Sequence, residues 1–394
     1  MDTQLAGTGA ATRSRVRDVD SLRGFALLGI LIVNITFFTS GYAANLVDDP
    51  NHSSDLDQVV HWVSSVLVDM KFYVLFSFLF GYSFTLQMGA AERAGAAFRP
   101  RMLRRIGGLF VLGVLHIVLL YSGDILASYA VLGVMLLAMR RVTDRTALVT
   151  AGVLYGLTIL SMLVSALLLD PSTFLPPAAE AQENARQSTE AMGGGLAEVA
   201  GENLAGIPLL FLVFGSLQGP TAMALFLLGL VAGRRRLLAG VTGREPLLRR
   251  VQLVGFPVGI AGGVVYASAG GNGDTFGVAA SVATAPFLAA AYVATLLRIT
   301  HSTGGRGVGA ALAPAGRMAL TNYLSQSLVC FLVFTGVGLG LTGELSAVET
   351  MAVAVAIFAA QLGVSAWWLR GHAYGPVEWL LRWVTNASRP AWRF

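Results

Sequence analysis

Charged side chains are scarce in this chain of 394 residues. They make up 12% of the sequence, whereas a soluble globular domain carries roughly 25% because its surface must be hydrated. Hydrophobic residues make up 55%, and the mean hydropathy is +0.67. This composition excludes soluble, fibrous and disordered classes and indicates a protein embedded in a lipid bilayer.

Cysteine is almost absent as well. The single cysteine, Cys330, lies in an apolar run, so we expect no intramolecular disulfide, no iron–sulfur cluster and no metal. The sequence has no P-loop, G-x-S-x-G or H-E-x-x-H motif, which leaves nucleotide hydrolysis and zinc proteolysis without support. The net charge of +5 comes from basic clusters between apolar segments, a pattern of membrane topology rather than of nucleic-acid binding.

Long apolar runs recur along the whole chain. Ten of them are long enough to cross a hydrocarbon core of about 30 Å, and none alternates with the period of two that a barrel strand requires. Because backbone hydrogen bonds must be satisfied within lipid, these runs predict an all-α polytopic membrane protein. The ten predicted spans cover residues 22–40, 71–89, 103–122, 125–140, 146–169, 205–232, 251–270, 275–298, 317–340 and 347–369.

The arginines predict the orientation of the chain. Six basic clusters fall between the spans on one side of the membrane, and an excess of basic residues marks cytoplasmic loops. We therefore predict a protein of the bacterial plasma membrane with cytoplasmic tails at residues 1–21 and 370–394 around one helical domain at 22–369. The basic clusters occupy residues 13–17, 93–105, 140–145, 234–250, 298–317 and 370–393.

Two segments on the predicted outer side are longer than turns. Residues 41–70 contain a short amphipathic helix, expected over residues 57–70. Residues 170–203 are rich in Ala, Glu, Gln and Gly. Such a segment could form a lid, but its composition favours a flexible or weakly helical connector.

The first predicted span carries two polar residues, Arg23 and Asn34. At 1.5 Å per residue they lie about 16 Å apart along the helix axis, Arg23 at the cytoplasmic lip and Asn34 in the outer half. Their spacing is close to three helical turns, so both side chains project from nearly the same face. Polar residues within lipid are candidates for function, and the alternative is a topological anchor with a helix-packing asparagine.

His116 is the one histidine expected deep in the membrane, about 22 Å from the cytoplasmic start of its span. Asp124 follows after a short turn, and Tyr129 lies further down the next span. A histidine beside a carboxylate is the minimal general base, because the acid orients the imidazole and stabilises its protonated form. A buried histidine that only bonds a neighbouring helix is the alternative.

Basic residues mark two other places. Arg101 and Arg104, at the cytoplasmic start of the third span, can bind phosphates such as those of coenzyme A, although ordinary topology signals look the same. Lys71, the only lysine, lies where the outer amphipathic helix meets the second span. We expect Lys71 to snorkel outward and pair with Asp69 or another outer carboxylate.

The ninth span opens with a polar stretch at residues 316–327 that cannot face lipid. Its polar side chains fall within about two helical turns. They are suited either to line a polar channel or to knit several helices together. The stretch contains Thr321, Asn322, Tyr323, Ser325 and Gln326.

Five motifs, in this order along the chain, resemble the YeiB-like bacterial membrane proteins, a family whose defining domain has no known function. The resemblance covers residues 18–386. The motifs read DSLRGFALLGILIVN at 20–34, KFYVLFSFLFG at 71–81, His116 followed by GDIL at 123–126 and by Tyr129, GRMALTNYL at 316–324, and GPVEWL at 375–380.

The opening motif also resembles the wider transmembrane acyltransferase superfamily, which includes the heparan-α-glucosaminide acetyltransferase. That resemblance implies transfer from cytoplasmic acetyl-CoA or another acyl-CoA to a glycan, lipid or small-molecule acceptor at the outer side. Many bacterial members have a histidine where this chain has Asn34, and the heparan-type enzyme has its histidine where this chain has Asn45. His116 has the most confined surroundings of the histidines that could substitute.

The leading hypothesis is therefore an acyl-CoA-dependent acyltransferase. His116, assisted by Asp124, would deprotonate the acceptor, and Asn34 would donate a hydrogen bond to the oxyanion. The rival is a carrier or exporter with a polar path through the bundle, and a non-catalytic scaffold is third. Expected partners are membrane lipids, acyl-CoA, the acceptor and a second copy in a homodimer, with no nucleic acid. Expected to hold acyl-CoA are Arg23, Arg101, Arg104 and Arg317, and expected to line the site are Tyr129, Lys71, Asn322, Tyr323 and Gln326.

Overall fold

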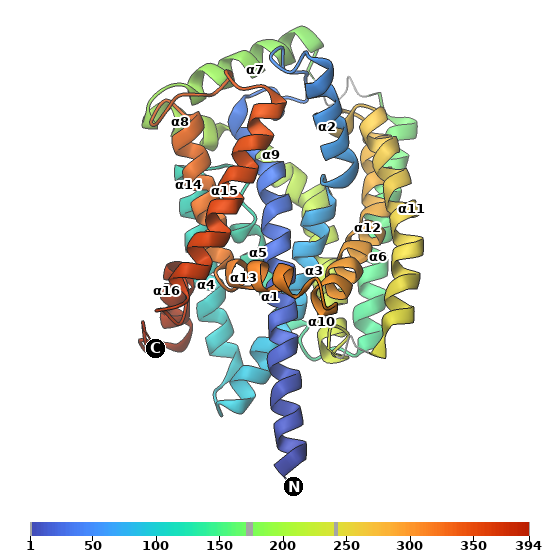
Figure 1. Ribbon diagram of the computed structural model, residues 1–394. Coiled ribbons are helices and arrows are strands. Elements are labelled where there is room, and N and C mark those ends of the chain that lie inside the picture. The colour runs from blue at the N-terminus through green and yellow to red at the C-terminus, as the bar shows by residue number, and fades with distance from the viewer. Residues whose placement is uncertain (1, 171–175, 240–242, 394) are drawn as a thin grey trace.

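The computed structural model describes residues 2–170, 176–239 and 243–393 (Figure 1). Within these residues the chain folds into helices and forms no β-strand, only an isolated bridge between His372 and Arg393. The predicted all-α class is confirmed. Helices form along the apolar runs because a backbone within lipid must satisfy its hydrogen bonds inside its own segment.

Eight helices of the described residues are long and apolar enough to cross a membrane by length and composition. The other two predicted spans form shorter apolar helices, α5 and α14, of 13 and 16 residues. At 1.5 Å per residue these measure about 20 Å and 24 Å, less than a hydrocarbon core. All ten predicted spans are therefore helical, eight of them as long apolar helices and two as shorter ones.

The helices have the following bounds: α1 Asp2–Thr39, α2 Asp55–Leu67, α3 Lys71–Arg93, α4 Phe98–Leu119, α5 Leu126–Ala138, α6 Asp144–Leu168, α7 Ala178–Met192, α8 Leu196–Ala205, α9 Ile207–Val213, the π-helix η2 Phe214–Gln218, α10 Gly219–Arg234, α11 Glu245–Ser268, the 3₁₀ helix η4 Gly271–Gly273, α12 Thr275–His301, α13 Arg306–Arg317, α14 Ala319–Phe334, α15 Ala347–Trp368 and α16 Pro376–Asn386. The predicted boundary at residue 21 lies inside α1, which is continuous there. The predicted C-terminal tail contains α16.

The predicted outer amphipathic helix is present as α2, which begins two residues earlier than expected. Ser54 caps it, since the N–H of Asp57 donates to Ser54 Oγ at 3.1 Å. Met70 then adopts a left-handed conformation with φ of 65°, and α3 begins at the next residue, Lys71. The connection between α2 and α3 is therefore a tight turn, and this turn fixes the direction in which the side chain of Lys71 leaves the backbone.

The second outer segment is more ordered than its composition suggested. Apart from residues 171–175, which lie outside the described residues, it forms α7 and α8. Figure 1 shows α7 lying across the end of the bundle. The N–H of Gly41 donates to Thr189 Oγ1 at 2.9 Å, and the N–H of Gly336 donates to the carbonyl of Met192 at 3.1 Å. Of the two predicted forms, flexible or weakly helical, the structure shows the helical one, because Ala, Glu and Gln are good helix formers.

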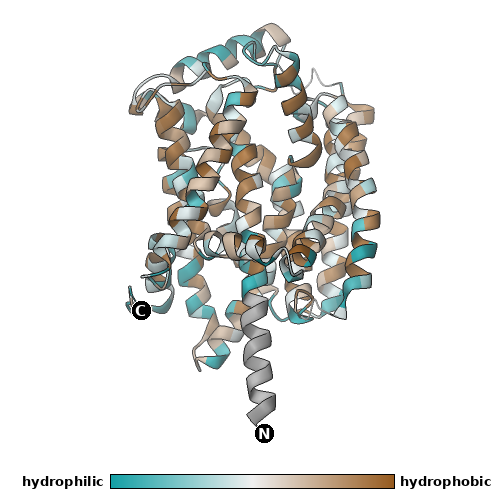
Figure 2. Cartoon of the chain, viewed as in Figure 1, coloured by the Kyte–Doolittle hydropathy of each residue, from teal (hydrophilic) through white to brown (hydrophobic). Residues whose placement is uncertain are grey.

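The N-terminal end of α1 and the C-terminal α16 lie on the same side of the bundle, opposite α7 (Figure 1). The loop between α3 and α4, the end of α10 and the start of α11, all within basic clusters, lie on that side too; we call it the basic side. Figure 2 shows hydrophobic residues through the middle of the helices and polar ones toward both ends. Helix α6 exposes large apolar side chains such as Leu157 and Leu167, at 59% and 77% exposure. Such a surface is stable only against lipid, which confirms a membrane protein.

Glycines set the closest helix contacts. A Cβ atom on Gly81 of α3 would collide with the carbonyl of Phe226 on α10, and one on Gly229 would collide with the carbonyl of Phe78. A Cβ on Gly24 of α1 would likewise collide with Leu312 on α13, and one on Gly316 with the carbonyl of Asp20. Small residues thus let helix backbones approach closely.

We expect Gly81→Val to destabilise the protein by about 1–3 kcal/mol or more, because the new side chain forces α3 away from α10. The matched control is Gly156→Val on α6, where a Cβ meets no atom within 4 Å. Thermal unfolding of both purified variants in the same detergent measures the difference. Equal melting temperatures for the two variants would contradict the tight α3–α10 contact.

Candidate functional site

His116 and Asp124 meet where α4 ends and α5 begins. His116 lies in the last turn of α4, and its Nδ1 is 3.0 Å from Asp124 Oδ1. Both side chains are at most 1% exposed. Asp124 Oδ2 accepts a 2.8 Å hydrogen bond from the N–H of Ala127 and so holds the first turn of α5. The structure therefore brings the predicted histidine and carboxylate together, and their catalytic role stays a prediction.

The imidazole of His116 is short of hydrogen-bond partners. Neither ring nitrogen has the geometry of a hydrogen bond with a described residue, although Nδ1 lies at ion-pair distance from Asp124. A buried polar group without a partner costs about 1–3 kcal/mol, so such groups usually have a reason to be there. With Nδ1 turned to the carboxylate, Nε2 is left available for another group.

Aromatic rings enclose the imidazole of His116. The Tyr323 ring lies 5.2 Å from it and the Tyr121 ring 6.3 Å, measured between centroids. Tyr323 Oη also donates a long hydrogen bond of 3.4 Å to Asp124 Oδ1. Tyr323 from α14 therefore joins this site, as the sequence predicted for a lining residue. Among the described residues, no group of three His, Cys, Asp or Glu side chains is placed to hold a metal ion.

Asn34 and Tyr129 have other surroundings. Asn34 is half-buried, and no hydrogen bond joins it to another described residue. Its sharing of a cavity with His116 stays a prediction. Tyr129 Oη forms a 2.6 Å hydrogen bond with Ser77 Oγ, and its ring packs 5.0 Å from Phe226. Tyr129 thus ties α5 to α3 and α10 instead of facing His116.

Arg101 and Arg104 hold the C-terminal end of α16. Arg101 Nε donates to Asn386 Oδ1 at 3.1 Å, and Arg104 Nε donates to the carbonyl of Thr385 at 3.1 Å. The last carbonyls of a helix have no partner within the helix, and cations near them are stabilising. No described contact joins either arginine to Arg23, and their binding of acyl-CoA stays a prediction.

Arg23 instead pairs with Asp20, and Arg317 lies within electrostatic range of the same carboxylate. Arg23 Nη1 donates to Asp20 Oδ1 at 2.9 Å, and its other terminal nitrogen donates to the hydroxyl of Ser83 on α3. Asp20 interacts electrostatically with both Arg23 and Arg317. The structure therefore groups two of the four arginines predicted to bind acyl-CoA at the basic end of α1.

Two arginines that the sequence analysis did not single out complete this group. Arg105 on α4 has Arg23, Arg382 and Glu378 as its charged neighbours. Arg105 directly follows the predicted Arg104, and Glu378 lies in the GPVEWL motif, so both lay within stretches already noticed. We call Arg23, Arg105, Arg317 and Arg382 the inner arginine cluster. Two carboxylates, Asp20 and Glu378, are the opposite charges near these four arginines. The excess of positive charge suits a polyanionic ligand.

Glu378 and Thr321 join α14 to α16 by capping each other's helix. Glu378 Oε1 accepts from the N–H groups of Leu320 and Thr321 at 2.6 Å and 3.0 Å, in the first turn of α14. Thr321 Oγ1 in turn accepts from the N–H of Val377 at 3.1 Å, in the first turn of α16. Burial raises the pKa of Glu378 above its ordinary value, and the hydrogen bonds from Thr321 and the backbone oppose that shift. A Cβ on Gly375 would collide with this carboxylate.

The polar stretch of α14 bonds to neighbouring helices. Asn322 Nδ2 donates to Ser365 Oγ on α15 at 2.9 Å, and Gln326 Nε2 donates to Gln361 Oε1 at 2.9 Å. Gln361 Nε2 returns a bond of 2.8 Å to Ser325 Oγ. These side chains are buried or half-buried, so of the two predicted roles the structure favours knitting helices together.

Lys71 does not snorkel outward, and that prediction was wrong. Its side chain is fully buried, and Nζ donates to the carbonyl of Ser65 at 3.0 Å and to Ser281 Oγ at 3.3 Å. The ammonium also lies 5.5 Å from the centroid of the Tyr266 ring. Asp69 is a charged neighbour, as expected. The left-handed turn at Met70 directs Lys71 inward between α2 and α12.

A cavity of about 450 Å³ opens on the basic side between α1, α12 and α13. Its lining includes Arg17, Arg306 and the paired Asp18 and His301, which lie 3.1 Å apart. A second cavity, between α11 and α12, is described below. Neither is lined by His116, so both are separate from the histidine–aspartate pair.

We expect Glu378→Ala to destabilise the protein by about 0.5–2 kcal/mol, the usual cost of removing a helix cap. The control is Glu180→Ala on α7, an exposed glutamate. Chemical or thermal unfolding in detergent measures both variants. A Glu378 variant as stable as the control would show that the carboxylate does not hold α14 and α16 together.

Comparison with known proteins agrees with the resemblance noticed in the motifs. A family described as "Protein of unknown function (DUF418)" matches residues 232–388. The chain is 32% identical over 396 residues to the "Uncharacterized protein YxaH" of Bacillus subtilis (strain 168), covering 96% of both chains. It is 28% identical over 391 residues to the "Uncharacterized protein YeiB" of Escherichia coli (strain K12), covering 95% of this chain and 97% of the other. It is also 28% identical over 375 residues to the "Uncharacterized 39.9 kDa protein in amylase 3'region" of Bacillus acidopullulyticus, covering 95% of both. The chain belongs to the YeiB-like family of membrane proteins with a DUF418 domain.

Proposed function

We propose that this protein is an acyltransferase that moves an acyl group from acyl-CoA on the basic side to a hydroxyl or amine acceptor at the opposite side. The observation that carries the proposal lies on one helix. Arg105 and His116, both on α4, are eleven residues apart, which is about 16 Å and close to three turns. One face of α4 therefore carries an arginine for phosphate and a histidine for proton transfer at different depths.

The inner arginine cluster supports the binding of acyl-CoA. Guanidinium groups bind phosphate in a bidentate manner and keep their charge when partly buried. The excess of arginines over carboxylates leaves positive charge that a phosphate would neutralise. The acyl thioester, at the far end of an extended arm, would then reach toward His116.

His116 supplies the base in this proposal. Its Nε2 accepts the proton of the acceptor while Asp124, 3.0 Å from Nδ1, stabilises the imidazolium that forms. The acceptor oxygen or nitrogen bonds to the acyl carbon, the carbon–sulfur bond breaks, and the leaving thiolate takes up the proton. The same bonds form and break overall whether the acyl group is transferred directly or through an acyl-histidine intermediate. In this proposal Asn34 or the phenol of Tyr323 donates a hydrogen bond to the oxyanion.

We expect His116→Ala to leave acetyl-CoA binding intact and to reduce acyl transfer by about 10²–10⁴-fold, the usual contribution of a general base. Arg105→Gln should instead weaken acetyl-CoA binding. The measurements are acetyl-CoA binding to the purified protein and transfer of labelled acetyl groups to acceptors in membranes of the producing cell. The matched controls are His61→Ala on α2 and Arg99→Gln on α4, both at exposed positions. Normal transfer by the His116 variant, or no acetyl-CoA binding by the wild type, would refute the mechanism.

Orientation is part of the proposal. We infer that the basic side is cytoplasmic and that the membrane is the bacterial plasma membrane, because basic loops remain in the cytoplasm. Both chain ends lie on that side (Figure 1). Acyl-CoA from the cytoplasm would then meet the inner arginine cluster, and the acceptor would approach from outside.

We expect alkaline phosphatase fused after residue 394 to be inactive, because that enzyme matures only outside the cytoplasm. The same enzyme inserted between α7 and α8, on the opposite side of the bundle, should be active. Colony colour and activity in intact cells measure both fusions. The reverse result would invert the topology and exclude cytoplasmic acyl-CoA as the donor.

A carrier is the second candidate, and one feature favours it. The span that ends in α10 is interrupted by the π-helix η2, and Tyr73 on α3 donates a hydrogen bond to the carbonyl of Gln218 there. π-Helical turns often occur at functional sites, and interrupted spans are typical of transporter binding sites. Uptake or export by sealed vesicles, without acetyl-CoA, separates this function from acyl transfer.

A further inference from the structure

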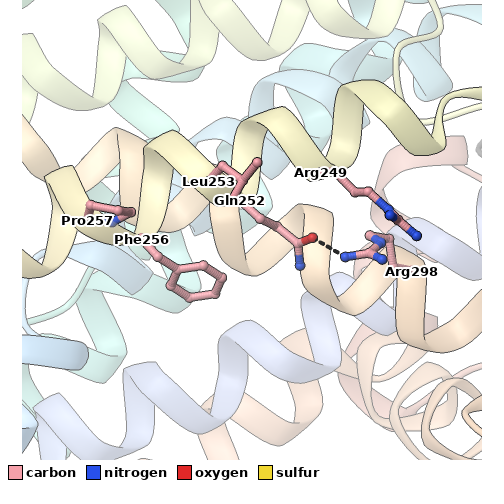
Figure 3. A pocket seen from close by; sticks show the side chains of 6 residues that line it. All are labelled: Arg249, Gln252, Leu253, Phe256, Pro257 and Arg298. Carbon is pink, nitrogen blue, oxygen red and sulfur yellow. Dashed lines mark hydrogen bonds between the residues drawn. The ribbon is translucent and has the colours of Figure 1, made fainter.

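A cavity of about 670 Å³ lies between α11 and α12, far from the histidine–aspartate pair. Figure 3 shows its lining, which changes in character along α11. From Arg249 to Pro257 the helix rises about 12 Å. The lining residues are Arg249, Gln252, Leu253, Phe256, Pro257 and Arg298.

The polar end of the cavity carries unbalanced positive charge. Arg298 Nε donates to Glu245 Oε1 at 2.7 Å, and Arg249 Nε donates to the same oxygen at 3.3 Å. Two guanidinium groups therefore share one carboxylate. Arg298 is held further by Gln252, which bonds to Thr295 at 2.6 Å (Figure 3). Arg249, with 65% of its side chain exposed, keeps donors free for an anion.

The other end of the cavity is apolar. Leu253 is 74% exposed, and Phe256 and Pro257 continue the surface along α11. The Phe256 ring packs 6.1 Å from the ring of Tyr292 on α12, which holds this apolar wall in place. A soluble phosphate compound would leave this apolar surface unused, whereas an acyl chain would cover it.

Both walls of the cavity belong to candidate membrane spans. Arg249 and Arg298 lie near the ends of α11 and α12 on the basic side, where lipid headgroups lie. From this arrangement we infer that the cavity binds one anionic phospholipid from the leaflet on the basic side. Its phosphate contacts Arg249 and Arg298, and an acyl chain lies along Leu253, Phe256 and Pro257. Basic pockets between transmembrane helices bind anionic headgroups in this way.

The test is lipid binding to the purified full chain, followed by native mass spectrometry. The probes are phosphatidylglycerol, phosphatidylcholine with the same acyl chains, and inorganic phosphate. We expect phosphatidylglycerol to bind with a stoichiometry of one, phosphatidylcholine to bind more weakly, and phosphate not to compete. Equal binding of the two lipids, or displacement by phosphate, would overturn the inference.

Arg249→Gln should weaken phosphatidylglycerol binding about fivefold, the effect of one arginine at an anionic lipid. The matched control is Arg250→Gln, because Arg250 is the next residue of α11, exposed and outside the lining. Leu253→Asn, on the exposed apolar wall, should weaken both lipids without changing the charge at the arginines. Unchanged binding by the Arg249 and Leu253 variants, or equal loss in the Arg250 control, would place the lipid elsewhere. The result is independent of acyl transfer.

Discussion

The constraint on which the structure depends is that a polar group surrounded by lipid must find its partner inside the protein. The buried ammonium of Lys71 is held by Ser65 and Ser281, and the amide of Asn322 is held by Ser365. Leaving such groups unpaired in hydrocarbon would cost several kcal/mol each. A polar residue that finds such a partner fixes the neighbour of its helix, as Lys71 and Asn322 do.

The glycine contact between α1 and α13 also shapes the inner arginine cluster. Gly24 and Gly316 let the two backbones touch, and each glycine is directly beside an arginine, Arg23 or Arg317. Close backbones place Arg317 within electrostatic range of Asp20, the carboxylate that pairs with Arg23. The close contact between the two helices and the positions of the two arginines therefore depend on the same two glycines. A larger residue at either glycine would separate the arginines.

The sequence predicted features that depend on local spacing. The apolar runs located the spans, and the short turn after His116 brought Asp124 back to it. The grouping of Arg105 with Glu378 depends on a contact between segments far apart in the chain, which no local pattern reveals. The inward direction of Lys71 depends on the left-handed backbone at Met70. Methionine is not a residue type from which that backbone conformation can be predicted. The lengths of α5 and α14 depend on where turns begin, which hydropathy alone does not fix.

Helix α4 has a consequence for selectivity under the proposed function. Arg105 and His116 belong to one continuous helix. The distance between the arginine that would bind the phosphates and the histidine that would act as base is therefore set by the helical rise, and it does not change when loops move. This fixed distance would select an acyl donor whose reactive carbonyl lies at a matching distance from its phosphates. One residue inserted between them would turn His116 by about 100° around the axis, so this part of α4 tolerates substitutions more readily than changes in length.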